Sequence, residues 1–156
     1  MGDAKRRAQQ KQGEFARLDA AFRAAGIETS AFGFYDDPAF LVREQSDPTF
    51  LETYARWVQA CPLDAAYEAH AREVVPKLAL LVADALVEDD LQGGCVVAYS
   101  LISRALDRLG VWSFGVQGSV NLSIDGTDWS RHLHTVDELD FPGGILGHAW
   151  AVAPPF

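Results

Sequence analysis

The hydrophobic pattern of the chain changes its period at Gly110, and this change limits the folds that the chain can adopt. Before Gly110, apolar residues recur at intervals of three and four, as they do on one face of an α-helix. After it, Val120, Leu122 and Ile124 alternate with polar residues, as they do along a half-buried β-strand. The sequence therefore predicts an α+β fold in which a helical N-terminal half packs on a small antiparallel sheet.

Length and composition indicate one globular domain over 1–156. A chain of 156 residues, 49% of them hydrophobic, is long enough to bury a core. We expect a helical front over 1–89, followed by a cysteine-bearing helix and a sheet over 90–156. The net charge is −9, so no nucleic-acid partner is expected, because binding to phosphates needs clustered lysine and arginine.

No targeting or membrane segment is predicted. The sequence lacks a run of about 18 apolar residues, the length that a membrane crossing requires, so no membrane partner is expected. Lys5, Arg6 and Arg7 are not followed by an apolar segment, so they do not begin a secretory signal. Two cysteines are too few for a disulfide framework, which favours a reducing, cytoplasmic location.

The segments before Cys95 are predicted to be mostly helical. They are an amphipathic helix over 4–25, an irregular stretch over 27–46, a helix that starts at Ser46-Asp47-Pro48 and ends at Pro62, and a helical stretch over 64–88. Pro76 is expected to kink or split the last of these, whose second half is apolar nearly all round and so should be buried between other elements. Cys61 completes an apolar stripe and is interpreted as a core residue. His70 has no second ligand at helical spacing, so it is interpreted as a surface or core histidine.

The segments from Cys95 onward combine one helix with strands. The prediction is a helix over 95–109, a long bent strand or a hairpin over 111–124, a turn at 125–128, an unassigned polar stretch over 129–142 and a final strand over 145–152. In the helix, Leu101 and Leu106 are placed on the apolar face and Ser103 and Asp107 on the polar face.

Cys95 has the setting of a cysteine nucleophile. It follows Gly93-Gly94 at the start of an apolar helix, where unpaired amides and the positive end of the helix dipole stabilise a thiolate. The two glycines allow a sharp bend and close approach of a substrate. The amide of Cys95 is then a candidate oxyanion donor, and the side chain of Gln92 is a second one.

His148 is the best candidate for the base that a nucleophilic cysteine needs. It lies in an apolar strand, with Trp150 on the same face two residues later. His132 and His134 lie in the polar stretch over 129–142. Taken singly, Cys95 is also explained as a packed helix residue, and His148 as a buried histidine bonded to backbone.

These motifs resemble one enzyme superfamily. Gly94-Cys95, a helix ending in Leu109-Gly110, a strand with Val116-Gln117-Gly118, and then His148-Ala149-Trp150 are similar to the transglutaminase-like branch of the papain-like cysteine enzymes, over about residues 90–153. The resemblance implies a papain-like core with Cys95 as nucleophile, His148 as base and then acid, and Gln92 as an oxyanion contributor. It implies hydrolysis of a peptide or protein amide, or acyl transfer, through a thioester, with no metal and no cofactor.

The sequence departs from the family pattern after His148. The family's orienting aspartate follows the histidine on the next strand, yet no acid lies between His148 and Phe156. Three explanations stay open. The natural protein continues past Phe156, another residue orients the imidazole (Asp140, Asp137 or Asn121), or the protein is not an efficient enzyme.

Two other functions remain as alternatives. The first is a catalytically inactive binding or adaptor module on the same fold. Six of the 13 basic residues lie in 1–23, so the helix over 4–25 is a candidate docking element for a protein partner, although a solvated helix face is the simpler interpretation. The second is an inhibitor of the immunity or antitoxin type that binds a basic partner through an acidic surface.

Overall fold

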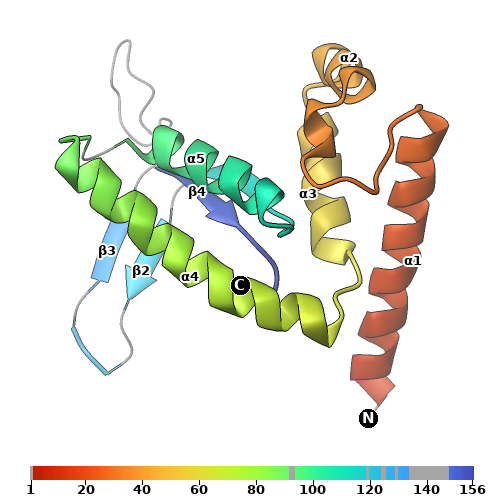
Figure 1. The fold of residues 1–156 in the computed structure, drawn as a ribbon. Helices are drawn as coiled ribbons and strands as arrows, with labels where there is room; N and C mark the ends of the chain where they lie inside the picture. Colours follow the sequence, from red (N-terminus) through yellow and green to blue (C-terminus); the bar gives the residue numbers. More distant parts are fainter. Residues whose placement is uncertain (1, 92–93, 119, 124–125, 129, 134–147) are drawn as a thin grey trace.

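The computed structural model describes residues 2–91, 94–118, 120–123, 126–128, 130–133 and 148–156, and its fold is α+β, as the sequence predicts (Figure 1). Its elements are α1 (Gly2–Ala24), η1 (Phe34–Asp36), α2 (Pro38–Ser46), α3 (Phe50–Ala60), α4 (Ala65–Glu88), α5 (Cys95–Arg108), β1 (Phe114–Gly118), β2 (Val120–Ser123), β3 (Ser130–Leu133) and β4 (His148–Val152). Among the described residues, no helix has the length and apolar character that a bilayer crossing requires.

The prediction of an irregular stretch over 27–46 is wrong from residue 34 onward. A 3-10 turn, η1, is followed by α2, because the Asp37 carboxylate accepts a hydrogen bond from the Ala39 amide at 2.7 Å and Pro38 takes the first helical position. The next helix is predicted to start at Ser46-Asp47-Pro48, with Asp47 as its cap, but α3 starts at Phe50. The Asp47 carboxylate accepts hydrogen bonds from the amide and the hydroxyl of Thr49, at 3.0 and 2.7 Å, so it closes the turn before α3.

The N-terminal helices enclose an aromatic core. Leu18 and Phe22 of α1 pack against Tyr54 and Trp57 of α3, and Phe34 of η1 lies among them. The apolar stripe predicted for the helix that ends at Pro62 is confirmed in α3. It consists of Phe50, Tyr54, Trp57 and Cys61, which all pack in this core, and Cys61 is buried at the end of α3. This core fixes α1 to the rest of the chain through its second half, while residues 2–13 are exposed.

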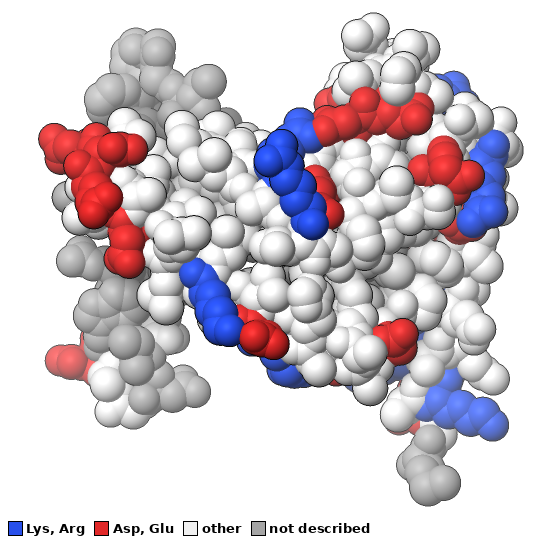
Figure 2. Space-filling view, in the orientation of Figure 1, with Lys and Arg blue, Asp and Glu red and all other residues white. Residues whose placement is uncertain are grey.

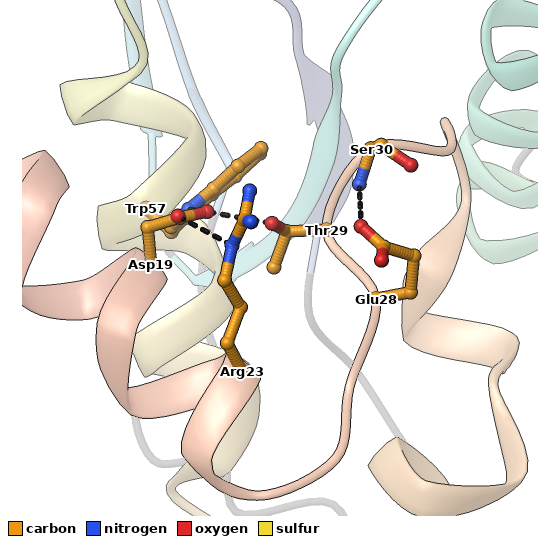
Figure 3. A network of polar contacts seen from close by, with 6 residues as sticks. All are labelled: Asp19, Arg23, Glu28, Thr29, Ser30 and Trp57. Atoms are coloured by element: carbon orange, nitrogen blue, oxygen red, sulfur yellow. Dashed lines mark hydrogen bonds and ion pairs between the residues drawn. The ribbon is translucent and has the colours of Figure 1, made fainter.

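A polar network holds α1 in place beside this core (Figure 3). The Asp19 carboxylate accepts from the Thr29 hydroxyl at 2.6 Å and from the Trp57 indole at 3.3 Å, and it pairs with Arg23 at 2.8 Å. The Asp19 carboxylate thus joins α1 to α3 and to the segment that follows α1. Because Asp19 is mostly buried, these bonds contribute more than an exposed ion pair does.

Pro76 does not split the long helix, because α4 runs unbroken through it. The second half of α4 is also not buried all round, contrary to the prediction. Leu80 and Leu81 are each 67% exposed and Val87 is 63% exposed, whereas Val82 is buried. The reason is that α4 packs on α5 along one side only, and no other described element covers its outer side.

The buried face of α5 agrees with the prediction only in part. Leu106 is buried as predicted, but Ser103 is also buried and Leu101 is 52% exposed. The helix is therefore turned so that a serine, and not Leu101, faces inward. At the C-terminal end of α5, the ring Nε2 of His70 lies 2.7 Å from the Leu109 carbonyl oxygen. His70 thus makes a structural contact with this helix, and its interpretation as a surface or core residue is confirmed.

The strands form two antiparallel pairs, β1 with β4 and β2 with β3. The prediction of a hairpin over 111–124 is therefore wrong, because β1 and β2 pair with other strands and not with each other. The alternative prediction of one long bent strand stays a prediction, because Ser119 between β1 and β2 lies outside the described residues. The predicted turn is confirmed at 126–128, where Gly126 has a φ of 79°. Strand β3 falls in the stretch over 129–142 that the sequence leaves unassigned.

The β1–β4 pair lies between two packing faces. Paired side chains share a face, and side chains alternate along each strand. Gly115 and its partner Ala151 face α5, because a Cβ on Gly115 would lie 2.6 Å from Cε2 of Tyr99. Phe114 and its partner Val152 face the aromatic core. The pair is thus a thin layer between α5 and the N-terminal helices.

Candidate functional site

Cys95 is the first residue of α5, and its side chain is half-buried. It precedes Tyr99 by one helical turn, so both lie on the side of α5 that faces the β1–β4 pair. A Cβ on Gly94 would be crowded, because it would lie 3.0 Å from the Leu91 carbonyl oxygen. The amide of Gly94 itself donates to that carbonyl. The predicted bend at Gly93-Gly94 is not tested, because Gly93 lies outside the described residues.

Cys95 and His148 lie at the same end of this layer. After α5 the chain turns at Gly110, so β1 runs back along the helix, and β4 is antiparallel to β1. It follows that β4 runs in the same direction as α5, as Figure 1 shows. Cys95 begins α5 and His148 begins β4, and the two elements are in close contact. The topology thus brings together the two ends that carry these residues.

The strand register places the two side chains on opposite sides of the layer. His148 pairs with Gly118, and its side chain alternates with that of the buried Ala149. Its ring lies 6.0 Å from the ring of Trp150, with an interplanar angle of 23°. Both rings are on the core side of the β1–β4 pair, whereas Cys95 is on the α5 side. A contact between the thiol and the imidazole requires the backbone of His148, the first residue of β4, to rotate, because the strand backbone sets the direction of the Cα–Cβ bond.

The remaining predicted site residues are not placed with this pair. Gln92, Asp137 and Asp140 lie outside the described residues. Asn121 belongs to β2, which pairs with β3 and not with β4. Within the part of the chain that the structure describes, no three histidine, cysteine, aspartate or glutamate side chains form a group able to hold a metal ion.

Cys61 has the properties of a core thiol. It is 7% exposed, and burial raises its pKa to about 11, with nearby Asp19 adding to the rise and Lys11 opposing it. A thiol with this pKa is almost entirely protonated at neutral pH. Cys61 is therefore a built-in reference for measurements on Cys95.

An acidic surface lies beside the start of α5. Figure 2 shows acidic side chains gathered at the end of the molecule where α4 ends. The chain there carries Asp84, Glu88, Asp89 and Asp90, which are all exposed. This surface attracts cationic molecules toward the end that holds Cys95, and it repels anionic ones.

A second polar cluster lies toward the C-terminal end of α5, and the sequence pattern does not predict it. The Tyr35 hydroxyl donates to the Asp107 carboxylate at 2.5 Å, and Arg104 pairs with Asp36 and covers the Tyr35 ring at 5.1 Å. The helical pattern places Asp107 on the outer polar face, and its partner Tyr35 is 72 residues distant in sequence. No local signal identifies this contact.

The buried Asp107 carboxyl is expected to make stability depend on pH. Burial raises its pKa above the ordinary value, against the opposing effects of the Tyr35 hydroxyl and Arg104. The folded state then binds the proton more tightly than the unfolded chain, so this contribution to stability is lost as pH rises through the folded-state pKa. The measurement is urea unfolding at several pH values. Asp107→Asn should gain stability relative to the natural chain as pH rises from about 4 to about 7.

Asp3→Asn is the control for this experiment, because Asp3 is exposed and pairs only with Arg6 among the described residues. Its stability relative to the natural chain should change little over the same range. If the difference in the free energy of unfolding between Asp107→Asn and the natural chain stays constant with pH, the raised pKa of Asp107 is contradicted.

Comparison with known proteins adds no relative to these observations. No family model, no curated protein and no solved structure matches the chain. The site is therefore interpreted from its own residues and geometry.

Proposed function

We propose that the chain is a cysteine-dependent acyl-transfer enzyme, an amide or peptide hydrolase that works through a thioester on Cys95. The observation that carries the proposal is the position of Cys95 at the first residue of α5, on the side that faces the sheet, with His148 beginning β4 at the same end. This placement supports the papain-like, transglutaminase-like interpretation of the sequence.

The proposed reaction has two steps. His148 takes the proton of the Cys95 thiol, the sulfur bonds to the amide carbonyl carbon, and the carbon–nitrogen bond breaks as the amine leaves with that proton. Water then gives a proton to His148 and attacks the thioester, which releases a carboxylic acid and restores the thiol. The amides at the start of α5 stabilise the oxyanion in both steps. For His148 to take part, the backbone at the start of β4 rotates and carries the ring to the α5 side.

The acidic surface favours a substrate without negative charge next to the scissile bond. Asp84, Glu88, Asp89 and Asp90 lie at the end of α4, a few residues before Cys95 begins α5. A cationic or neutral amide approaches this end without repulsion. A cytoplasmic location belongs to the same proposal, because the reaction needs a reduced thiol.

Alkylation by iodoacetamide at about pH 6 tests the proposal, with cysteine modification followed by mass spectrometry. An activated Cys95 should react at least about tenfold faster than N-acetylcysteine, and lose this advantage in denaturant. Cys61 should stay unmodified until the chain unfolds, because it is buried. If folded Cys95 reacts no faster than the model thiol, the nucleophile is not activated and the proposal fails.

A second candidate function is a binding or adaptor module, and a specific observation favours it. His148 and Cys95 lie on opposite sides of the β1–β4 layer, and the first half of α1 is exposed and basic. Deletion of residues 2–13 leaves Leu18 and Phe22 in the core, so it removes the docking surface without removing packing. If the deletion abolishes binding to a partner protein, and Cys95 is not activated, the results would support the function of a binding or adaptor module.

A further inference from the structure

A pocket of about 410 Å³ lies between α5, the edge of β1 and the α2–α3 side of the molecule. We call it the tyrosine pocket, after Tyr35, Tyr54 and Tyr99, which line it together with Phe114. Its volume is within the range of small-molecule sites. Aromatic rings on several walls favour a flat apolar group as the occupant.

Gly115 gives the pocket its shape. A Cβ at this position would lie 2.6 Å from Tyr99 Cε2 and 3.0 Å from Cδ2, so any larger residue would displace the Tyr99 ring. Tyr54 is fixed on another wall, because its hydroxyl donates to the Ser113 carbonyl at 3.0 Å. The aromatic walls are thus held in place by the fold.

The pocket also carries one uncompensated negative charge. Its charged lining residues are Asp36, Glu44 and Arg104, and Asp36 is paired with Arg104. Glu44 is half-buried, and its carboxylate has no hydrogen bond or ion pair with any described residue. A partly buried carboxylate without a partner attracts a cation.

Buried hydroxyls without partners gather in the same walls. Within the described residues, three buried side-chain oxygens lack a hydrogen bond, and they belong to Ser103, Ser113 and Asp107. Ser103 and Ser113 line the tyrosine pocket, and Asp107 lies behind Tyr35. Unpartnered buried polar groups are rare in proteins and call for a partner.

We propose that the tyrosine pocket binds a small molecule that joins an aromatic ring to a protonated primary amine. The ring lies among the tyrosine side chains, and the ammonium group donates to the Glu44 carboxylate. The seryl hydroxyls are further acceptors for the ammonium protons. This binding does not depend on chemistry at Cys95, and it holds whether or not the chain is an enzyme.

Calorimetric titration with three matched probes tests the proposal. They are 2-phenylethylamine, 2-phenylethanol and 3-phenylpropionate, which differ in charge and share the phenyl ring. The amine should bind about fivefold to tenfold more tightly than the alcohol, and the anion most weakly. Failure of the amine to bind, or equal affinity for amine and alcohol, would overturn the proposal.

Two variants locate the binding in the pocket. Glu44→Gln keeps the shape of the side chain and should remove the preference for the amine, whereas Glu52→Gln changes an exposed charge on α3 and should retain it. Leu41→Trp, at a partly exposed lining position, should fill the space and abolish binding of all three probes. An amine preference that survives Glu44→Gln, or binding unchanged in Leu41→Trp, would also overturn the proposal.

Discussion

Replacement of Phe34 by alanine is expected to lower the free energy of unfolding by about 4 kcal/mol. Phe34 is 4% exposed and lies at the centre of the aromatic core. Its ring contacts the rings of Phe22, Phe40, Tyr54, Trp57 and Trp112. These partners come from α1, α2, α3 and the segment before β1, so they cannot collapse together into the space that the ring leaves.

Urea unfolding followed by tryptophan fluorescence measures this loss, since Trp57 and Trp112 lie in the same cluster. Phe32→Ala is the matched control. Phe32 is 37% exposed, and its ring centroid lies 4.1 Å from that of Trp112, so its loss should cost about 1 kcal/mol. Similar losses for the two variants would show that η1 does not anchor the core.

Replacement of His148 by alanine is expected to slow the alkylation of Cys95 at about pH 6 by at least about tenfold. A neighbouring imidazole accepts the thiol proton, and the imidazolium then stabilises the thiolate. The two residues begin elements that run in the same direction, so a rotation of the backbone at the first residue of β4 brings the ring to the side of Cys95. Iodoacetamide labelling, resolved by residue with mass spectrometry, measures the rate.

His70→Ala is the control for this experiment. His70 contacts the Leu109 carbonyl at the far end of the same helix, so its removal perturbs α5 without changing the surroundings of Cys95. Cys95 in His70→Ala should be labelled at the same rate as Cys95 in the natural chain. If His148→Ala also labels at the natural rate, the imidazole does not activate the thiol, and the binding-module function gains support.

The sequence predicts those parts of the fold that local patterns determine. The buried face of α3 is identified by the apolar stripe of Phe50, Tyr54, Trp57 and Cys61, because residues three and four apart share a helix face. Gly110 ends α5 in the left-handed region, with a φ of 72°. The alternating pattern after it correctly predicts strands. In the candidate site, the helix start at Cys95 and the strand at His148 are predicted in the same way.

The parts that the sequence does not predict depend on distant partners. An Asp-Pro pair serves as a helix start at Asp37 but closes a turn at Asp47, and only the surrounding packing separates the two. Leu80 is exposed and Ser103 is buried because α5 covers one side of α4 and is itself turned toward β1. The side of the sheet on which His148 lies depends on its pairing with Gly118, which its own sequence does not specify.

Trapping of an acyl group on Cys95 tests whether this residue is the nucleophile. The chain is mixed with p-nitrophenyl acetate, quenched in acid and analysed by intact mass and peptide mapping. We expect a burst of p-nitrophenol and one acetyl group on Cys95, removed by hydroxylamine and absent from Cys95→Ala. Cys95→Ala that gives the same burst, or folded natural chain that acquires no acetyl group on Cys95, would contradict the proposed function.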